Sequence, residues 1–224
     1  MIANVSPAPY SLLPLMETPL FDRSELIRCT EGTLFGNSTP KLPSPPLLAF
    51  DEIIEISSDG GKFGRGYAIA RKRLSSMSWV FDSHFPENPV MPGTMLIEGL
   101  LQLAGFFGAY AGERGKGRVA RVDEVKFLAE VTPQDEEILY RIDVRKHNRE
   151  QKLLLAEGRV VAGGTERATV GSLLLVRLAT SRATPLNGFG RTALLRFGLS
   201  LPCVSHPQEA RRRLSGRIRR GPRS

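Results

Sequence analysis

A single long apolar segment constrains the fold of this chain more strongly than any other feature. Residues 94–112 are apolar on nearly every side of a helix, and Pro92 and Gly93 precede them. Proline is favoured in the first turn of a helix, where its missing N–H costs nothing, so we expect the helix to start near Gly93. The segment also carries Glu98, Gln102 and four glycines. These residues favour a buried helix over a membrane span.

Strand patterns surround this helix on both sides in the sequence. The clearest is ILYRIDVR, residues 138–145, where apolar residues alternate with charged ones as in a half-exposed antiparallel strand. Because no second helical pattern supplies a covering layer, we predict an α+β fold in which an antiparallel sheet wraps around the one long helix. The last four strands are predicted to form a meander. The expected strands lie within residues 47–56, 62–74, 118–131, 138–145, 152–163 and 167–179.

The net charge of +8 is concentrated at the C-terminal end of the 224 residues. Residues 180–224 contain ten arginines, no lysine and one acid, a net charge of +9, which leaves −1 for residues 1–179. We expect residues 180–224 to form a basic, disordered tail, and the proline-interrupted residues 1–20 to form an unstructured extension that makes a poor secretory signal. Residues 21–179 then form one domain. The basic charge of residues 180–224 is the only feature that would favour nucleic-acid binding, and we do not expect the protein to bind nucleic acid.

The two cysteines bear on the cellular setting. Cys29 and Cys203 are far apart and match no metal-ligand spacing, which argues against a disulfide framework and against a zinc site. We therefore expect a reducing, cytoplasmic environment and no metal ion.

Polar side chains form a stripe on the apolar helix. Thr94, Glu98 and Gln102 follow one another at spacings of four, so they share one face. A solvated surface stripe is the alternative, but the apolar residues on the other faces favour a buried stripe that lines a cavity. The helix N-terminus offers free N–H groups and a positive dipole end, which suit a developing oxyanion. Gly93 permits close approach of a substrate carbonyl.

One histidine precedes this helix in a proline-rich loop. His84 lies in the segment from Trp79 to Pro92, which we expect to lack regular structure. An imidazole, with a reference pKa of ~6.5, is the natural base near neutral pH. Alone, a loop histidine is more often a surface residue, but beside a carboxyl group and a helix N-terminus it completes an acid–base pair. His147, in a predicted hairpin turn, and His206, in the tail, are weaker candidates.

The segment HFPENPVMPGTMLIEGLLQ, residues 84–102, resembles the signature of the hot-dog-fold β-hydroxyacyl-ACP dehydratases. The resemblance covers roughly residues 24–179. It is closest to the 3-hydroxydecanoyl-ACP dehydratase/isomerase branch and to dehydratase domains embedded in synthases. It implies a long central helix wrapped by an antiparallel sheet, and a homodimer with shared active sites. The other matching segments, in order, are ELIRCTEGTLFG, KLPSPPLL, GKFGRGY, WVFDSHF, GKGR and EVKFLAEVTP.

The resemblance also implies roles for individual residues. His84 matches the catalytic histidine and Glu98 the catalytic acid, and in the family these two come from opposite subunits. Gly93 matches the residue whose backbone N–H binds the thioester carbonyl. The carbonyl of Val90 matches the group that orients the histidine.

Two further positions match residues that support the acid, namely Gln102 and Arg118. The decanoyl-type branch typically has aspartate where Glu98 stands, whereas glutamate is usual in the branch that does not isomerise. The resemblance therefore leaves isomerase activity open.

These observations predict an enzyme that dehydrates 3-hydroxyacyl-ACP to trans-2-enoyl-ACP in fatty acid or polyketide-type synthesis. No metal or organic cofactor is needed, because an acid, a base and an oxyanion site suffice for the elimination. The expected partner is the acyl carrier protein that carries the substrate. A hot-dog thioesterase and a non-catalytic acyl-binding module are the alternatives.

We predict that the basic tail speeds association with acyl carrier proteins, which are acidic as a class. This increase in the association rate should disappear once salt shortens the Debye length below ~8 Å. The full chain is compared with a chain ending at Ala179, at low and high salt. Truncation should lower kcat/KM only for an ACP-bound substrate and only at low salt. An equal loss with a small thioester mimic would mean that the tail supports the fold.

Overall fold

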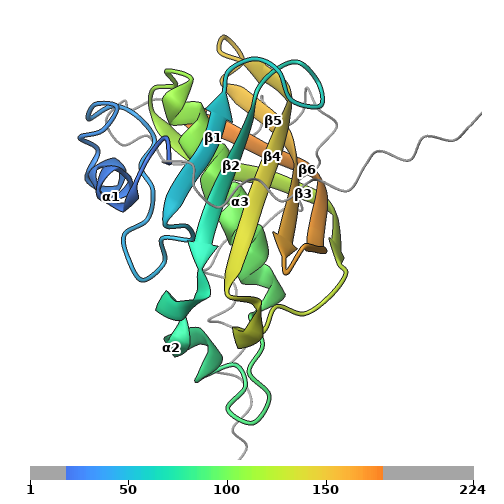
Figure 1. Cartoon of the computed structure of the whole chain (residues 1–224). Coiled ribbons are helices and arrows are strands. Elements are labelled where there is room, and N and C mark those ends of the chain that lie inside the picture. Colours follow the sequence, from blue (N-terminus) through green and yellow to red (C-terminus); the bar gives the residue numbers. More distant parts are fainter. Residues whose placement is uncertain (1–18, 179–224) are drawn as a thin grey trace, which may run out of the picture. The chain divides into compact units, whose positions relative to one another are not determined.

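A computed structural model of the chain describes residues 19–178 (Figure 1). The predicted tail and most of the predicted N-terminal extension lie outside the described residues, so both stay predictions. Within the described part, no helix is long and apolar enough to cross a membrane. The helices are α1 (Arg23–Glu31), α2 (Ser78–Phe81) and α3 (Gly93–Tyr110), with 3₁₀ turns at Leu74–Ser76 and Pro133–Asp135. The strands are β1 (Glu52–Ser57), β2 (Tyr67–Arg73), β3 (Lys116–Phe127), β4 (Glu137–Asn148), β5 (Leu153–Ala162) and β6 (Thr165–Leu178).

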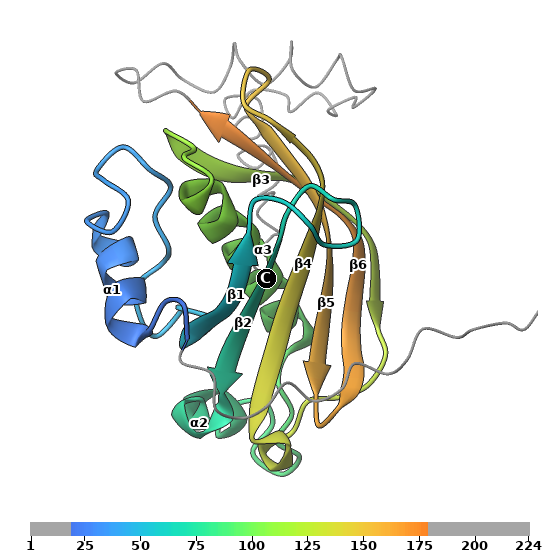
Figure 2. The ribbon, with the colours of Figure 1, turned by 45° about the horizontal axis from the view of Figure 1, so that its top comes forward.

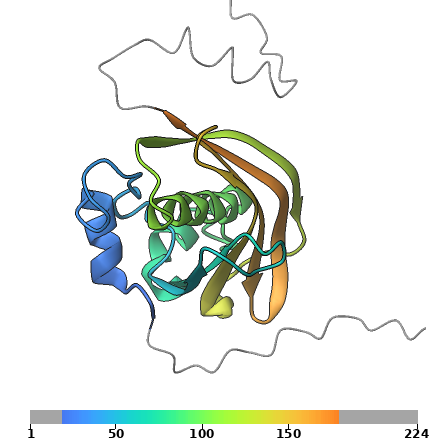
Figure 3. The same ribbon diagram turned by 90° about the horizontal axis from the view of Figure 1, so that it is seen from above.

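The six strands form one antiparallel sheet in the order β1-β2-β4-β5-β6-β3. The sheet curves around α3, as the view from above shows (Figure 3). The predicted α+β fold, a long helix wrapped by an antiparallel sheet, is therefore confirmed.

The predicted meander is wrong in one respect, which is the position of β3. This strand pairs with β6 along its whole length, from Lys116 opposite Leu178 to Phe127 opposite Ala168. It therefore lies at the far edge of the sheet and not beside β4 (Figure 2). Helix α3 lies between β2 and β3 in the sequence and occupies the concave face of the sheet. The chain that follows the helix therefore pairs with β6 and not with β2 or β4.

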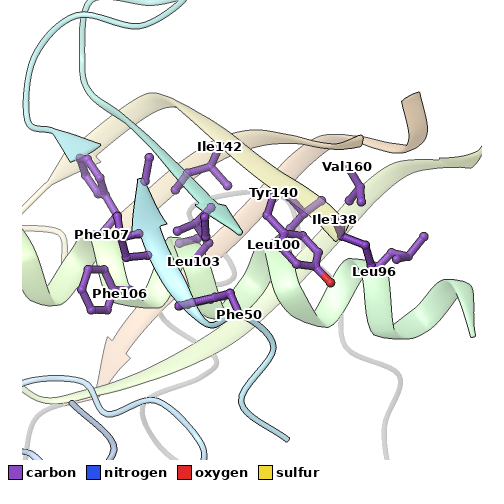
Figure 4. Packing of buried hydrophobic residues seen from close by; sticks show 14 of the residues in the cluster. Phe50, Leu96, Leu100, Leu103, Phe106, Phe107, Ile138, Tyr140, Ile142 and Val160 are labelled. Atoms are coloured by element: carbon purple, nitrogen blue, oxygen red, sulfur yellow. The ribbon is translucent and has the colours of Figure 1, made fainter. Parts of the chain in front are cut away.

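Helix α3 supplies much of the core on the concave side of the sheet (Figure 4). Its glycines allow close packing, because a Cβ at Gly99 would overlap the ring of Tyr140 on β4. Burying one leucine or phenylalanine side chain contributes about 1.5–3 kcal/mol, so the buried side chains of α3 contribute substantially to the stability of the fold. The buried residues of α3 that Figure 4 labels are Leu96, Leu100, Leu103, Phe106 and Phe107.

Helix α1 was not expected from the sequence. Asp22 caps it in a capping box, because its side chain accepts the N–H of Glu25 and the Glu25 side chain accepts the N–H of Asp22, both at 3.0 Å. Gly32 ends it in the left-handed conformation, with a φ of 84°. Just before α1, Leu20 donates its N–H to the carbonyl of Ile53 at 2.9 Å, so the described structure begins inside the expected extension.

The segment from Trp79 to Pro92 was expected to lack regular structure. Its first residues instead complete the short helix α2, which buries Val80 and Phe81. The remainder is irregular, as the prolines predict.

We predict that Gly99→Ala destabilises the protein by about 1–3 kcal/mol, because the new methyl group would overlap the Tyr140 ring in a packed core. Gly108→Ala, on the same helix, is the matched control. Its Cβ would lie 3.6 Å from Cγ of Glu113, an ordinary contact, so alanine should be neutral or stabilising there. Urea unfolding measures both changes. Equal stability of the two variants would contradict this packing account.

Candidate active site

The loop between α2 and α3 holds the imidazole of His84 by two backbone groups. Nδ1 lies 2.9 Å from the carbonyl oxygen of Val90. The N–H of Val90 donates to the carbonyl of His84, also at 2.9 Å, which closes the loop. Because a carbonyl oxygen only accepts hydrogen bonds, Nδ1 carries the proton in the neutral ring and Nε2 keeps its lone pair. The arrangement suits a base that acts through Nε2.

The start of α3 supplies unpaired donors close to this loop. Pro92 is the N-cap residue and no side chain caps this end of the helix, so the first N–H groups, including that of Gly93, lack intrahelical partners. The N–H of Met91 donates to the carbonyl of Val131 at 2.8 Å, which fixes the chain just before the helix. Donors at a helix N-terminus can stabilise negative charge on an oxygen atom.

One turn further along α3, the side chain of Glu98 is held by Gln102. The Gln102 Nε2 donates to Oε1 of Glu98 and to the carbonyl of Leu47, each at 2.9 Å. Its Oε1 accepts the N–H of Ala49 at 2.9 Å. These backbone partners set the orientation of the buried amide, so its remaining N–H can only point to Glu98. One oxygen of Glu98 is therefore occupied, and the other is the one that can reach a substrate.

The prediction of a wholly buried polar stripe is wrong for the single chain. Gln102 is 6% exposed, but Thr94 and Glu98 are exposed. The sheet covers other faces of α3, and the face that carries Glu98 opens into a cleft. Within residues 19–178, no element covers the side chain of Glu98.

This cleft has a volume of about 580 Å³ and lies between residues 37–43, α3 and the start of β3. Glu98, Gln102 and Arg118 all line it, so the structure brings these three predicted residues together. His84, Val90 and Gly93 form a second group at the start of α3 and do not line the cleft. The six predicted residues therefore occupy two places in one chain, and their catalytic roles stay predictions. Lys41 and Lys116 also line the cleft, so three cationic side chains, with Arg118, stand among its lining residues.

His147 does not lie in a hairpin turn, as the sequence predicted, but near the end of β4. Its Nε2 is 2.5 Å from Oε1 of Glu113, and Arg177 pairs with the other oxygen of this carboxylate. Burial lowers the pKa of His147, and the charge of Arg149 lowers it further. The group ties the end of α3 to β4 and β6. No sequence signal could have found it, because its members are far apart in the chain and belong to no motif.

Among residues 19–178, no cluster of three or more histidine, cysteine, aspartate or glutamate side chains is placed to hold a metal ion. The start of α3 offers a positioned imidazole and a helix N-terminus, which are what proton abstraction beside a carbonyl requires. The positioned carboxyl group of Glu98 lies apart from them, in the cleft.

Comparisons with known proteins show the family of the chain. Residues 42–170 match a family model described as a FabA-like domain. The dehydratase heterocomplex ApeI:P from Xenorhabdus doucetiae has a chain of similar fold, with a TM-score of 0.50 and 14% identity, over 71% of this chain and 95% of that one. A hypothetical thioesterase with coenzyme A from Streptococcus pneumoniae TIGR4 matches over 57% of this chain and 88% of that one, with a TM-score of 0.39 and 12% identity.

We predict that Gln102→Ala destabilises the chain by about 1–3 kcal/mol, because it leaves the N–H of Ala49 and the carbonyl of Leu47 without their partner. Thr94→Ala, on the same face of α3 but exposed, should change stability little. Chemical denaturation measures both. If Gln102→Ala were as stable as Thr94→Ala, the amide would not link α3 to residues 47–49.

Proposed function

Since the chain belongs to the FabA-like domain family, whose fold is the hot-dog fold, we propose that it removes water from 3-hydroxyacyl thioesters on acyl carrier protein. The products are trans-2-enoyl thioesters, in fatty acid or polyketide-type synthesis. The observation that carries the proposal is the contact between Nδ1 of His84 and the Val90 carbonyl, which leaves Nε2 free as a base. The proposal covers dehydration and does not include isomerisation of the double bond.

The residues divide the elimination between them. His84 Nε2 takes the proton from C2, and the N–H of Gly93 with the helix dipole stabilises the negative charge that develops on the thioester oxygen. Glu98 gives its proton to the departing hydroxyl, which leaves as water. His84 then carries one proton more and Glu98 one fewer, so a proton transfer through solvent restores the starting state.

A homodimer would bring the two groups of residues together. In the described part of the chain, β3 pairs only with β6, so its other side is an edge of 12 residues. Val119 and Val125 on this strand are 47% and 38% exposed. The unpaired N–H and C=O groups along a long edge strand form a template for pairing with another chain. We propose that a second copy pairs along β3 and places its His84 opposite Glu98.

The cleft also suits the proposed carrier. Lys41, Lys116 and Arg118 line it together with Glu98. Cations at this position favour the phosphate of a phosphopantetheine arm and an acidic carrier protein.

The experiment that tests the function is incubation of the purified protein with 3-hydroxyacyl-ACPs of several chain lengths, followed by mass spectrometry of the products. The expected product is an enoyl group that is still bound to the acyl carrier protein through its thioester. A free carrier thiol would instead indicate a thioesterase. Bound but unchanged substrate would indicate a non-catalytic acyl-binding module.

We predict that His84→Ala and Glu98→Gln each lower dehydration by ~10²–10⁴-fold while the protein stays folded, because each removes one acid–base group. Glu87→Gln changes an exposed glutamate in the same loop as His84 and should retain activity. Initial rates with a saturating substrate measure the loss. Turnover near that of the wild type in either of the first two variants would refute the assignment.

We further predict that mixing the His84→Ala and Glu98→Gln variants restores part of the activity once subunits exchange. One site of a mixed dimer then holds both an intact His84 and an intact Glu98. Mixed dimers can be purified with two different affinity tags before the assay. Verified mixed dimers without activity would argue against a site shared between subunits.

A further inference from the structure

The ring of Phe127 lies directly on the first residue of α3. A Cβ added at Gly93 would be 2.7 Å from Cε1 and 2.9 Å from Cδ1 of this ring, which is closer than carbon atoms pack. Phe127 is the last residue of β3. This contact explains why position 93 is glycine without reference to any substrate, because a side chain there would collide with the ring.

The same ring is 56% exposed, although one side of it packs on Gly93. A single exposed phenylalanine would need no explanation. Here a second exposed ring lies close by in the same group of residues, because Phe85 stacks on His84 with 4.1 Å between ring centroids. The predicted base His84 and the predicted oxyanion residue Gly93 therefore each have an exposed phenyl ring beside them.

The position of Phe127 relative to α3 is fixed by the backbone. The N–H of Met91 donates to the carbonyl of Val131, which holds the residues before α3 against the residues that follow β3. The end of β3 is itself paired with β6, where Phe127 lies opposite Ala168. The ring is therefore held beside the helix N-terminus from both sides.

We propose that Phe127 is a further substrate-binding residue of this site. One side of its ring covers Gly93, and its exposed side forms an apolar wall next to the N–H groups at the start of α3. The first carbons of the acyl thioester lie against this wall, and the wall limits the access of water to the thioester oxygen. When water is excluded and the thioester is held in one orientation, the hydrogen bond that its oxygen accepts from the helix N-terminus becomes stronger. This inference rests on the proposed dehydration.

The first test compares Phe127→Ala with Phe127→Leu and with Leu128→Ala. Leu128 is the matched control, because it follows Phe127 in the chain and is 52% exposed. We expect Phe127→Ala to lower kcat/KM for a 3-hydroxyacyl thioester by ~10–100-fold, the order of loss that follows misplacement of a substrate. Phe127→Leu should recover most of this loss, since it restores an apolar wall, and Leu128→Ala should behave as the wild type.

The dimer fraction and the unfolding midpoint are measured at the assay concentration for each variant. If Phe127→Ala retained the kcat/KM of the wild type, the inference would be wrong. It would also be wrong if the decrease in kcat/KM were proportional to the decrease in the dimer fraction, because Phe127 would then act only as an interface residue. An inactive wild type would instead refute the proposed function, so the two failures are distinguishable.

A second test separates the two reasons for glycine at position 93. Gly93→Ala should unfold at lower denaturant concentration than the wild type, because the methyl group collides with the Phe127 ring. The double variant Gly93→Ala/Phe127→Ala should regain that stability, because the ring is gone, yet have lower activity than Phe127→Ala. If the double variant had the same activity as Phe127→Ala, the role of Gly93 would be only to make room for the Phe127 ring. The substrate would then not need the space beside Gly93.

Discussion

The packing of α3 against the concave face of the sheet is the constraint on which the rest of the structure depends. An apolar helix of 18 residues has to be covered, and one sheet of six strands bends around it to do so. Gly99 is one point of close packing, because a Cβ there would overlap the ring of Tyr140 on β4.

The same constraint determines where the polar chemistry can lie. The sheet covers the apolar faces of α3, and the remaining face carries Glu98 and Gln102 into a cleft. The N-terminus of the helix emerges beside the loop that holds His84. The side chains of Glu98 and His84 thus lie at two different places on the described part of the chain. Under the proposed dehydration, a second copy paired along β3 would bring the two places together.

The fold was predictable from the sequence because its decisive signals are local. The apolar run with Pro92 in front specifies α3, and strict alternation at residues 138–145 specifies β4. The pairing of β3 with β6 was not predictable, because strand neighbours far apart in sequence are selected by the three-dimensional path of the chain. Helix α1 was missed although the spacing of Asp22 and Glu25 is a capping-box signal.

The residues of the candidate site were found through one motif, and their contacts came from the structure. The contact between His84 and Val90 is local, so the resemblance could imply it. The exposure of Glu98 was missed because the spacing of residues on a helix shows which of them share a face, and does not show whether the sheet covers that face. Phe127 was missed because its neighbour Gly93 is far away in the sequence, with helix α3, the following turn and strand β3 between them.

The measurement that tests the central claim most directly is the exchange of the C2 hydrogen of a 3-hydroxyacyl-ACP with deuterium from solvent, followed by mass spectrometry. Proton abstraction by His84 does not require the departure of the hydroxyl group when the helix N-terminus stabilises the charge on the thioester oxygen. The account predicts exchange without dehydration in Glu98→Gln and no exchange in His84→Ala. Exchange that persists in His84→Ala would contradict it, because another group would then be the base.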